Sequence, residues 1–423
     1  MNSFFQKIKL MLQDRLLRKK VLFMAGLLLL FRLLATIPIP GVDVVRLNAL
    51  LSGNQFFGLL DIFSGGGLGN LSIVMLGVGP YITSSIIMQL ATMMSPKLKA
   101  LYHEEGEAGR LKFAQYSRLL SVPLALLQSF GFLLLLQKQG VLIDLTFFEQ
   151  LVNVFVITGG SILLMWLGEL MTEYGVGNGI SMIIFAGIVS QIPTVLSQTI
   201  ITFEVSQIPM YIGFIIASIA IVIGVVIVTE AERPIPITYA KRIRGNKVYG
   251  GVSTYLPLRV NQAGVIPIIF ALSILLFPQL IFNFLSTVGN PMIQQISSFV
   301  LRLLSNGWFY ASSYFLLVFL FTYFYTAVTF DPDSISTNLQ KSGAFIPGVR
   351  PGQSTSDYIS KVLTRITLVG ALFLGAIAVL PLAVQGITGI QSLAIGGTAL
   401  LIVVSVVLDL VKKVDAQLSM REY

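Results

Sequence analysis

Ten apolar stretches, each long enough to cross a lipid bilayer, run through most of this chain of 423 residues. Only 11% of its residues are charged, whereas about 25% is typical of a soluble domain. A transmembrane β-barrel would show alternating segments of about 10 residues, and runs such as Leu27–Leu30 and Ile219–Val228 do not alternate. Because a membrane-spanning helix needs about 20 apolar residues, the sequence predicts an all-α polytopic membrane protein. Its helices are expected near residues 21–39, 71–94, 117–137, 151–171, 180–196, 208–229, 263–284, 308–328, 364–384 and 390–411.

The basic residues are sorted along the chain. All but four of the 28 lysines and arginines fall before the first predicted helix, after the last, or in the gaps that follow the second, sixth and eighth. Such residues mark cytoplasmic segments, so the N-terminal segment 1–20 and the tail 412–423 are expected in the cytoplasm. The first helix is too long for a removable signal peptide and is expected to stay as an anchor. This sorting explains the net charge of +9 better than nucleic-acid binding does.

Two long basic loops, residues 229–262 and 331–364, lie on the predicted cytoplasmic side. The first mixes valine and tyrosine with its charges, a pattern typical of an extended hairpin. The second carries several glycines and prolines, which predict fixed turns. Protruding loops of this kind are natural docking surfaces.

The ten helices divide into an N-terminal half, residues 21–196, and a C-terminal half, residues 197–411. Glycine and proline interrupt the second helix of each half, and these residues are Gly77, Gly79, Pro80, Gly264 and Pro267. Interrupted helices at matching positions of two repeats tend to line a conduit. Helix breakers are also common in transmembrane helices without a special role, so both interpretations stay open.

Residues suited to catalysis or energy coupling are scarce. The single histidine, His103, cannot form an H-E-x-x-H zinc site, and the sequence has neither a G-x-S-x-G turn nor a G-x-x-x-x-G-K-[ST] loop. The absence of cysteine excludes disulfides and thiolate metal sites. Among the ionisable residues in the predicted spans, Arg32 lies within the first helix, whereas Glu169 and Asp409 lie near cytoplasmic helix ends. One ionisable residue inside the membrane is weak support for ion-coupled transport. We therefore expect no enzyme activity, no metal and no cofactor, and we interpret Gly175–Gly179 as a tight turn.

Aliphatic residues recur at a spacing of four on two predicted helices: Val78, Ile82 and Ile86 on one, Ile180 and Ile184 on the other. Residues four apart share a helix face. Three interpretations of such a face stay open: it contacts lipid, it packs in a core, or it lines a pore.

Five motifs in matching order resemble those of the SecY family, the channel subunits of the bacterial Sec translocon. These motifs are Phe63–Gly66, Gly79–Ile82, Gly177–Ser181, Ala263–Pro267 and Lys341–Gly352. The resemblance runs from the first helix to the last and points to a Gram-positive bacterium.

The resemblance implies two pseudo-symmetric five-helix halves around a central hourglass pore. It places a constriction ring on six aliphatic residues, of which only one is not isoleucine: Val78, Ile82, Ile180, Ile184, Ile269 and Ile402. A short re-entrant plug helix maps to residues 56–67, with apolar contacts and hinge glycines at Phe57, Leu59, Leu60, Ile62, Phe63, Gly65, Gly66 and Gly67.

The family's lateral gate lies between the second and seventh helices. Its residues map to Thr83, Ser84, Ser85, Ile86, Gln128, Pro267 and Ser273. The hydroxyl groups among them either hold neighbouring helices together, at about 0.6 kcal/mol per hydrogen bond, or bond to their own helix backbone.

The cytoplasmic loops resemble the family's binding surface for the motor ATPase SecA and for ribosomes. Matching basic positions are Lys241, Arg242, Lys247, Arg259 and Arg350, while Asn246 stands where many relatives carry arginine. The family further implies the partner subunits SecE and SecG, clients that carry signal sequences, contact with membrane lipids, and a location in the bacterial cytoplasmic membrane.

The expected function is a protein-conducting channel that passes unfolded polypeptides across the membrane and releases transmembrane segments into lipid. Aliphatic side chains suit this task because they offer a moving chain no hydrogen bonds and because a narrow apolar constriction dewets when empty. The alternative is a secondary transporter of a small solute. An intramembrane enzyme would lose activity when His103 or Asp61 is replaced, and we expect neither replacement to abolish function.

Overall fold

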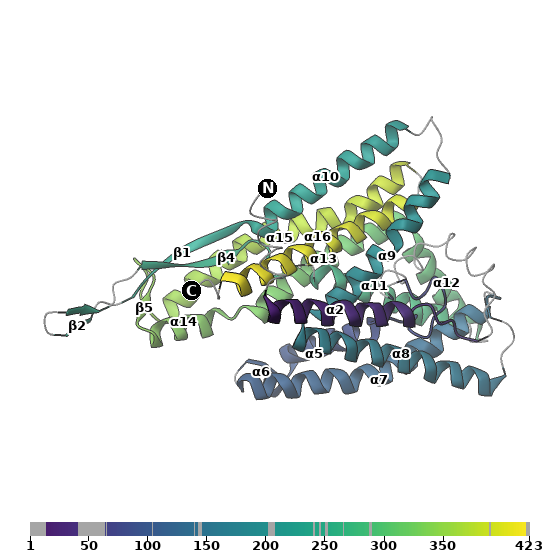
Figure 1. Cartoon of the computed structure of the whole chain (residues 1–423), viewed down its shortest axis with the longest axis horizontal. Coiled ribbons are helices and arrows are strands. Elements are labelled where there is room, and N and C mark those ends of the chain that lie inside the picture. Colours follow the sequence, from purple (N-terminus) through teal and green to yellow (C-terminus); the bar gives the residue numbers. More distant parts are fainter. Residues whose placement is uncertain are drawn as a thin grey trace.

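The computed structural model describes residues 14–40, 64, 66–103, 105–138, 140–142, 146–201, 208–239, 242–244, 247–249, 253–264, 266–286, 290–388 and 391–419. A helix lies at each of the ten predicted apolar stretches (Figure 1). These helices are α2 (Arg15–Leu34), α5 (Gly79–Met94), α7 (Gly106–Lys138), α8 (Phe147–Tyr174), α9 (Gly179–Ile201), α10 (Ile208–Glu230), α11 (Ile266–Leu285), α13 (Gly307–Thr329), α15 (Gln353–Thr388) and α16 (Gln391–Ser419).

The structure also departs from the predicted helices. Among the described residues, three further helices were not expected: α6 (Pro96–His103), α12 (Pro291–Ser305) and α14 (Pro332–Lys341). The second predicted helix was expected from residue 71, but α5 begins at Gly79 and residues 73–78 form turns. The left-handed backbone of Gly77, at φ 58°, and Pro80 in the first helical turn explain this late start.

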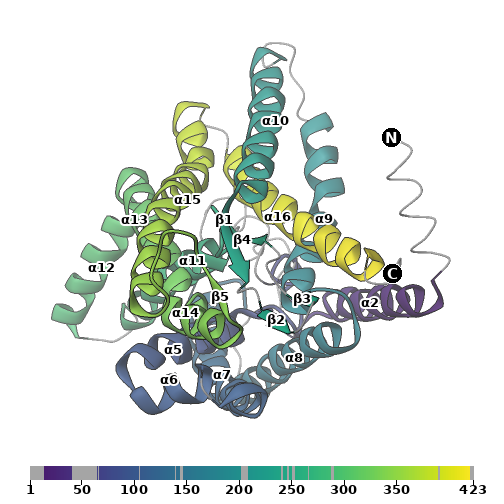
Figure 2. The same ribbon diagram turned by 90° about the vertical axis from the view of Figure 1, so that its left-hand side faces the viewer.

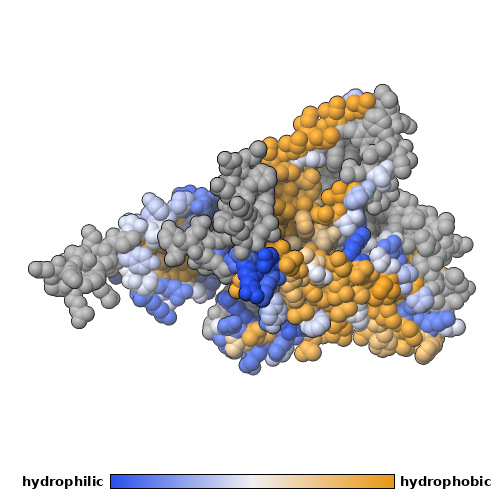
Figure 3. Space-filling view, viewed as in Figure 1, coloured by the Kyte–Doolittle hydropathy of each residue, from blue (hydrophilic) through white to orange (hydrophobic). Residues whose placement is uncertain are grey.

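Several helices are suited to a bilayer. Among the described residues, five are long and apolar enough to cross it, at Gly106–Gln137, Phe147–Tyr174, Ile266–Asn283, Gly307–Lys341 and Gln353–Leu380. Shorter apolar helices lie at Gly179–Pro193 and Ile215–Glu230. Figure 3 shows apolar residues over most of the flank of the bundle and hydrophilic residues gathered toward one end. The protein is therefore a helical membrane protein with several apolar spans.

The two long loops form one small unit that projects from the hydrophilic end (Figure 1). Strand β1 (Glu232–Tyr239) pairs antiparallel with β4 (Ser253–Arg259), which confirms the predicted hairpin. Strand β5 (Ala344–Phe345), from the second loop, pairs with the other edge of β1, so the two loops are joined. The short strands β2 (Arg242–Arg244) and β3 (Lys247–Tyr249) pair farther along the hairpin. The unit has its own apolar core of Ile235, Leu258, Ile346, Ile359 and Val362.

The predicted turns of the second loop are also present, since Gly343, Gly348 and Gly352 all adopt positive φ. The start of α2 and the end of α16 lie at the same end of the bundle as this unit (Figure 1). Lys412 Nζ lies 2.8 Å from Glu230 Oε1, which ties the end of α16 to the end of α10. Seen from this end, α5, α7 and α8 lie along one side of the bundle and α10 and α15 along the opposite side (Figure 2).

Candidate functional site

Helices from the two halves of the sequence meet along two seams. Within each half, α5 packs on α7 and α7 on α8, while α13 packs on α15 and α10 on α16. Between the halves, α11 contacts α5 and α7, and α16 contacts α9. Helices α5, α7, α9, α11 and α16 therefore lie along the boundary between the halves.

The six predicted ring residues come from four of these helices, α5, α9, α11 and α16. Val78 caps the start of α5, which carries Ile82, whereas the other four lie on α9, α11 and α16: Ile180, Ile184, Ile269 and Ile402. Five of the six are buried, with at most 6% of their surface exposed, and Ile180 is partly buried against the same apolar cluster. None of the six is exposed. We call these residues the aliphatic set.

Helix α8 contacts the backbone of the residues that precede Val78 in the sequence. Ser161 Oγ donates a hydrogen bond of 2.8 Å to the carbonyl oxygen of Gly77. One residue earlier in α8, Gly160 lies so close to the Ile73 carbonyl that a Cβ atom at position 160 would overlap its oxygen. Sequence reasoning missed both contacts, although the Gly159–Gly160 pair in an otherwise bulky helix was a signal of close packing.

The other side of the same segment is held by the chain that follows α2. The Ile39 amide donates to the Leu71 carbonyl and the Ile73 amide to the Ile37 carbonyl, both at 2.9 Å. Residues 71–78 are thus fixed from two directions. These contacts, together with the Gly77 backbone and Pro80, set the position of Val78 at the head of α5.

The start of α9 is fixed by the run Gly175–Gly179, which forms the predicted tight turn. Gly177 has φ 92°, and the side-chain oxygen of Asn178 accepts hydrogen bonds from the Ile180 and Ser181 amides at 3.0 and 3.2 Å. Gly179 lies directly against the Gly168 carbonyl of α8, where no larger residue fits. This capped and closely packed turn sets Ile180 in the first turn of α9.

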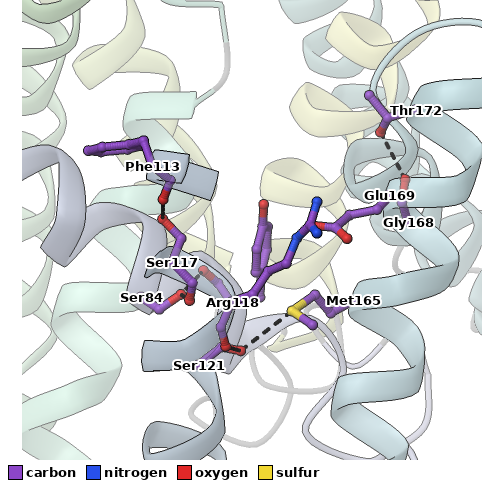
Figure 4. Close-up of polar contacts among 10 residues, drawn as sticks. Ser84, Phe113, Ser117, Arg118, Ser121, Met165, Gly168, Glu169 and Thr172 are labelled. Atoms are coloured by element: carbon purple, nitrogen blue, oxygen red, sulfur yellow. Dashed lines mark hydrogen bonds and ion pairs between the residues drawn. The ribbon is translucent and has the colours of Figure 1, made fainter. Parts of the chain in front are cut away.

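The predicted gate residues behave differently from one another. Thr83 and Ser273 donate hydrogen bonds to carbonyls four residues back in their own helices, at 3.0 and 2.9 Å. Ser85 accepts a hydrogen bond from Gln89 of the same helix at 3.2 Å. Ser84 joins two helices, because its hydroxyl lies 2.8 Å from the Ser117 carbonyl on α7 (Figure 4). The interpretation as bonds between helices therefore holds for Ser84, which also lies 2.9 Å from the Tyr81 carbonyl of its own helix. The backbone interpretation holds for Thr83 and Ser273, whereas Ser85 bonds to a side chain of its own helix.

The remaining gate residues are apolar or unbonded. Ile86 and Pro267 are buried, and the partly buried Gln128 side chain makes no hydrogen bond within the described part of the chain. Across the described residues of α5 and α11, no hydrogen bond or ion pair joins the two helices. Their contact is apolar.

The contact between α7 and α8 is polar by comparison. Arg118 Nε lies 2.5 Å from Glu169 Oε1 in an ion pair, with the two side chains 42% and 20% exposed (Figure 4). Farther along the same contact, the hydroxyls of Ser129 and Thr158 lie 3.1 Å apart. Separating α5 from α11 therefore breaks no polar bond, whereas separating α7 from α8 breaks several.

Most of the predicted plug lies outside the described residues, including Phe57, Leu59, Leu60, Ile62, Phe63 and Gly65. Of its hinge glycines, Gly66 has φ 82°, a backbone conformation that favours glycine. Gly67 lies close to the Ser72 side chain, where an added Cβ atom would approach the hydroxyl to 2.8 Å.

The predicted basic residues of the cytoplasmic loops fall on the projecting unit. Arg242 lies in β2 and Lys247 in β3, whereas Lys241 and Asn246 lie outside the described residues. Arg259 is exposed at the end of β4, and Arg350 is exposed in the turn before α15. Among the described residues no group of histidine, aspartate or glutamate side chains is suited to hold a metal.

Comparison with known proteins shows close relatives. Residues 72–411 match the SecY family. The protein translocase subunit SecY of Mycobacterium bovis is 42% identical over 428 residues, which cover 96% of each chain. Relatives from Streptomyces and Corynebacterium are about as similar, so the matches include actinobacteria, which are Gram-positive.

Solved structures show the same fold. One comes from work on the plug domain of a SecY protein, described as stabilising the closed channel and maintaining a membrane seal. It matches 93% of this chain and 91% of its own, with a TM-score of 0.65 and 20% identity. Sec61 in a canine ribosome–channel complex from the endoplasmic reticulum matches the same shares, with a TM-score of 0.60 and 18% identity.

Proposed function

The chain belongs to the SecY family of protein-conducting channels, and from this membership we propose how its parts divide the work of the channel. It is a translocase subunit without enzymatic activity. The finer proposal is a set of ten transmembrane helices in two five-helix halves, residues 21–196 and 197–411, around an hourglass pore. It is supported by the helix at each of ten apolar stretches and by the two seams between the halves.

The aliphatic set forms the constriction of this pore. The observation that carries this assignment is burial: five of the six side chains are buried in one apolar cluster, the sixth packs against it, and all come from helices at the two seams. A ring of isoleucine and valine side chains closes around a polypeptide of any sequence, because these side chains form no hydrogen bonds with the polypeptide. When empty it resists ions, because water leaves a narrow apolar constriction.

Labelling a translocating polypeptide tests the constriction. A photo-crosslinker at Ile82 and another at Ile269 are expected to label a secretory chain stalled in the channel, because both side chains would line its path. The control carries the same crosslinker at Ile219, which is 55% exposed on the flank of α10 and should contact lipid. Labelling at neither inner position, or equal labelling at Ile219, would remove the ring assignment.

Helices α5 and α11 form the lateral gate. Their apolar contact supports this, since the pair separates without loss of hydrogen bonds, whereas α7 and α8 stay joined by the Arg118–Glu169 pair. A client segment then partitions by its own hydrophobicity. Each central leucine-like residue favours lipid by about 0.3–0.6 kcal/mol, and a charged residue opposes entry by about 2.5–3.5 kcal/mol.

Residues 56–67 form the plug that seals the external side of the constriction. Deleting them is expected to raise the ion conductance of the resting channel, because the aliphatic set would then close the pore alone. Conductance of vesicles that contain the deletion variant is compared with that of vesicles containing the unaltered chain. Equal conductance would contradict the plug assignment.

The projecting unit, which contains strands β1 to β5, is the docking surface on the cytoplasmic side. Its partners would be the motor ATPase SecA and the ribosome, with SecE and SecG as neighbouring subunits in the bacterial cytoplasmic membrane. Clients with signal sequences would enter from this side. The start of α2 and the end of α16 lie at the same end as this unit, which supports cytoplasmic placement of both termini.

A further inference from the structure

Helix α12, which the sequence analysis did not foresee, has three distinct faces. One faces the protein, with Ser297 fully buried and Leu304 9% exposed. A second is apolar yet exposed, and its residues are Met292, Ile296, Phe299 and Leu303, with exposed fractions between 37% and 71%. A third is polar and exposed, and its residues are Gln294, Gln295, Ser298, Arg302 and Ser305. At about 100° per residue the centres of the three faces are about 120° apart.

The position of α12 is set by its neighbours. It packs on α11 and α13, at the end of the bundle remote from β1 and β4 and at the outer edge beside α13 (Figures 1 and 2). Asn306 alone separates α12 from α13. It ends α12 and caps α13, with its side-chain oxygen 3.1 Å from the Trp308 amide. The helix is therefore held at the level where a membrane-spanning helix begins.

We propose that α12 lies in the plane of the membrane interface of the external leaflet, with Met292, Ile296, Phe299 and Leu303 inserted among the lipid acyl chains. A helix with an apolar face and a polar face is suited to this boundary. The remaining face of α12, with Ser297 and Leu304, packs on the protein. Each of the three surroundings of the helix, protein, lipid and water, therefore has a matching face.

Two features favour lipid over a second protein as the occupant of the apolar face. Exposed apolar side chains continue along the chain into α13, which is apolar enough to span a membrane and begins with Trp308 and Phe309, 86% and 40% exposed. Tryptophan is enriched where membrane meets water. The only charged residue of α12 is Arg302, on the polar face, where a lipid phosphate or water can contact it. The assignment to the external leaflet rests on the proposed orientation of the channel.

Spin labels test this placement in the full chain, whose lack of cysteine means that a single introduced cysteine is the only labelled site. Phe299→Cys and Ile296→Cys report the apolar face, and Ser298→Cys and Gln295→Cys report the polar face of the same turns. In vesicles of phosphatidylcholine and phosphatidylglycerol, collisions with oxygen measure lipid exposure, and collisions with a water-soluble nickel complex measure water exposure.

Oxygen collisions should dominate at 296 and 299, at a depth of about 5–10 Å below the headgroups. Nickel collisions should dominate at 295 and 298. Labels at 296 and 299 that respond mainly to nickel, or to neither reagent because protein covers them, would overturn the proposal. A label at Ile219→Cys on α10 should respond to oxygen at greater depth. If it does while 296 and 299 do not, the membrane placement of the channel stands and only that of α12 fails.

Discussion

Replacing Ile82 by aspartate is expected to make the resting channel leak ions. Ile82 lies on α5, is 6% exposed and packs in the apolar cluster that contains the rest of the aliphatic set. A carboxylate at this position has no cation among the aliphatic set and is costly to bury without water. Water would enter to solvate it, and a hydrated constriction no longer excludes ions.

The expected size of this effect is large. Since about 1.4 kcal/mol changes an equilibrium tenfold, even a modest shift from the dry to the hydrated state should raise the conductance roughly tenfold or more. The measurement is single-channel or vesicle conductance without a client. Ile82→Leu is the matched control, because it keeps the volume and the apolar character and should leave the seal nearly intact. Equal leak from both variants would show that position 82 is not at the constriction.

The sequence predicted the helices and turns because their signals are local. Long apolar runs predicted all ten helices, the composition of loop 229–262 predicted the β1–β4 hairpin, and the glycines of 175–179 predicted the turn before α9. Each of these follows from hydrophobic length or from backbone freedom within a few residues. The aliphatic set was chosen by resemblance to the family, and its burial could not be read from spacing alone.

What the sequence did not predict depends on partners distant in the chain. The β5 strand of two residues exists because the edge of β1 is open to it, about 100 residues earlier. Gly77 and Pro80 mark the start of α5, but the contacts that hold the preceding turn come from Ser161 and Gly160 of α8. Helix α12 was overlooked because a three-sided pattern is neither a continuous apolar run nor a simple two-sided one. These features require knowledge of which helices are neighbours.

Replacing Gly160 by alanine is expected to disturb both the stability and the seal of the channel. The new methyl group would overlap the Ile73 carbonyl, which is backbone and cannot rotate away. Residues 73–78 must then shift, and Val78 and the start of α5 shift with them. Overpacking of this kind costs about 1–3 kcal/mol. We expect a lower unfolding temperature in detergent and a higher conductance of the resting channel in vesicles.

The neighbouring glycine provides the matched control. A Cβ atom at Gly159 would meet nothing within 4 Å, so Gly159→Ala introduces the same methyl group in the same turn of α8 without a clash. Alanine favours a helix over glycine by about 1 kcal/mol, so this variant should be as stable as the unaltered chain or more so, with unchanged conductance. If Gly160→Ala behaves in the same way, α8 does not hold the segment before α5. If Gly160→Ala lowers stability but leaves the resting conductance unchanged, the contact is structural and Val78 is not part of the seal.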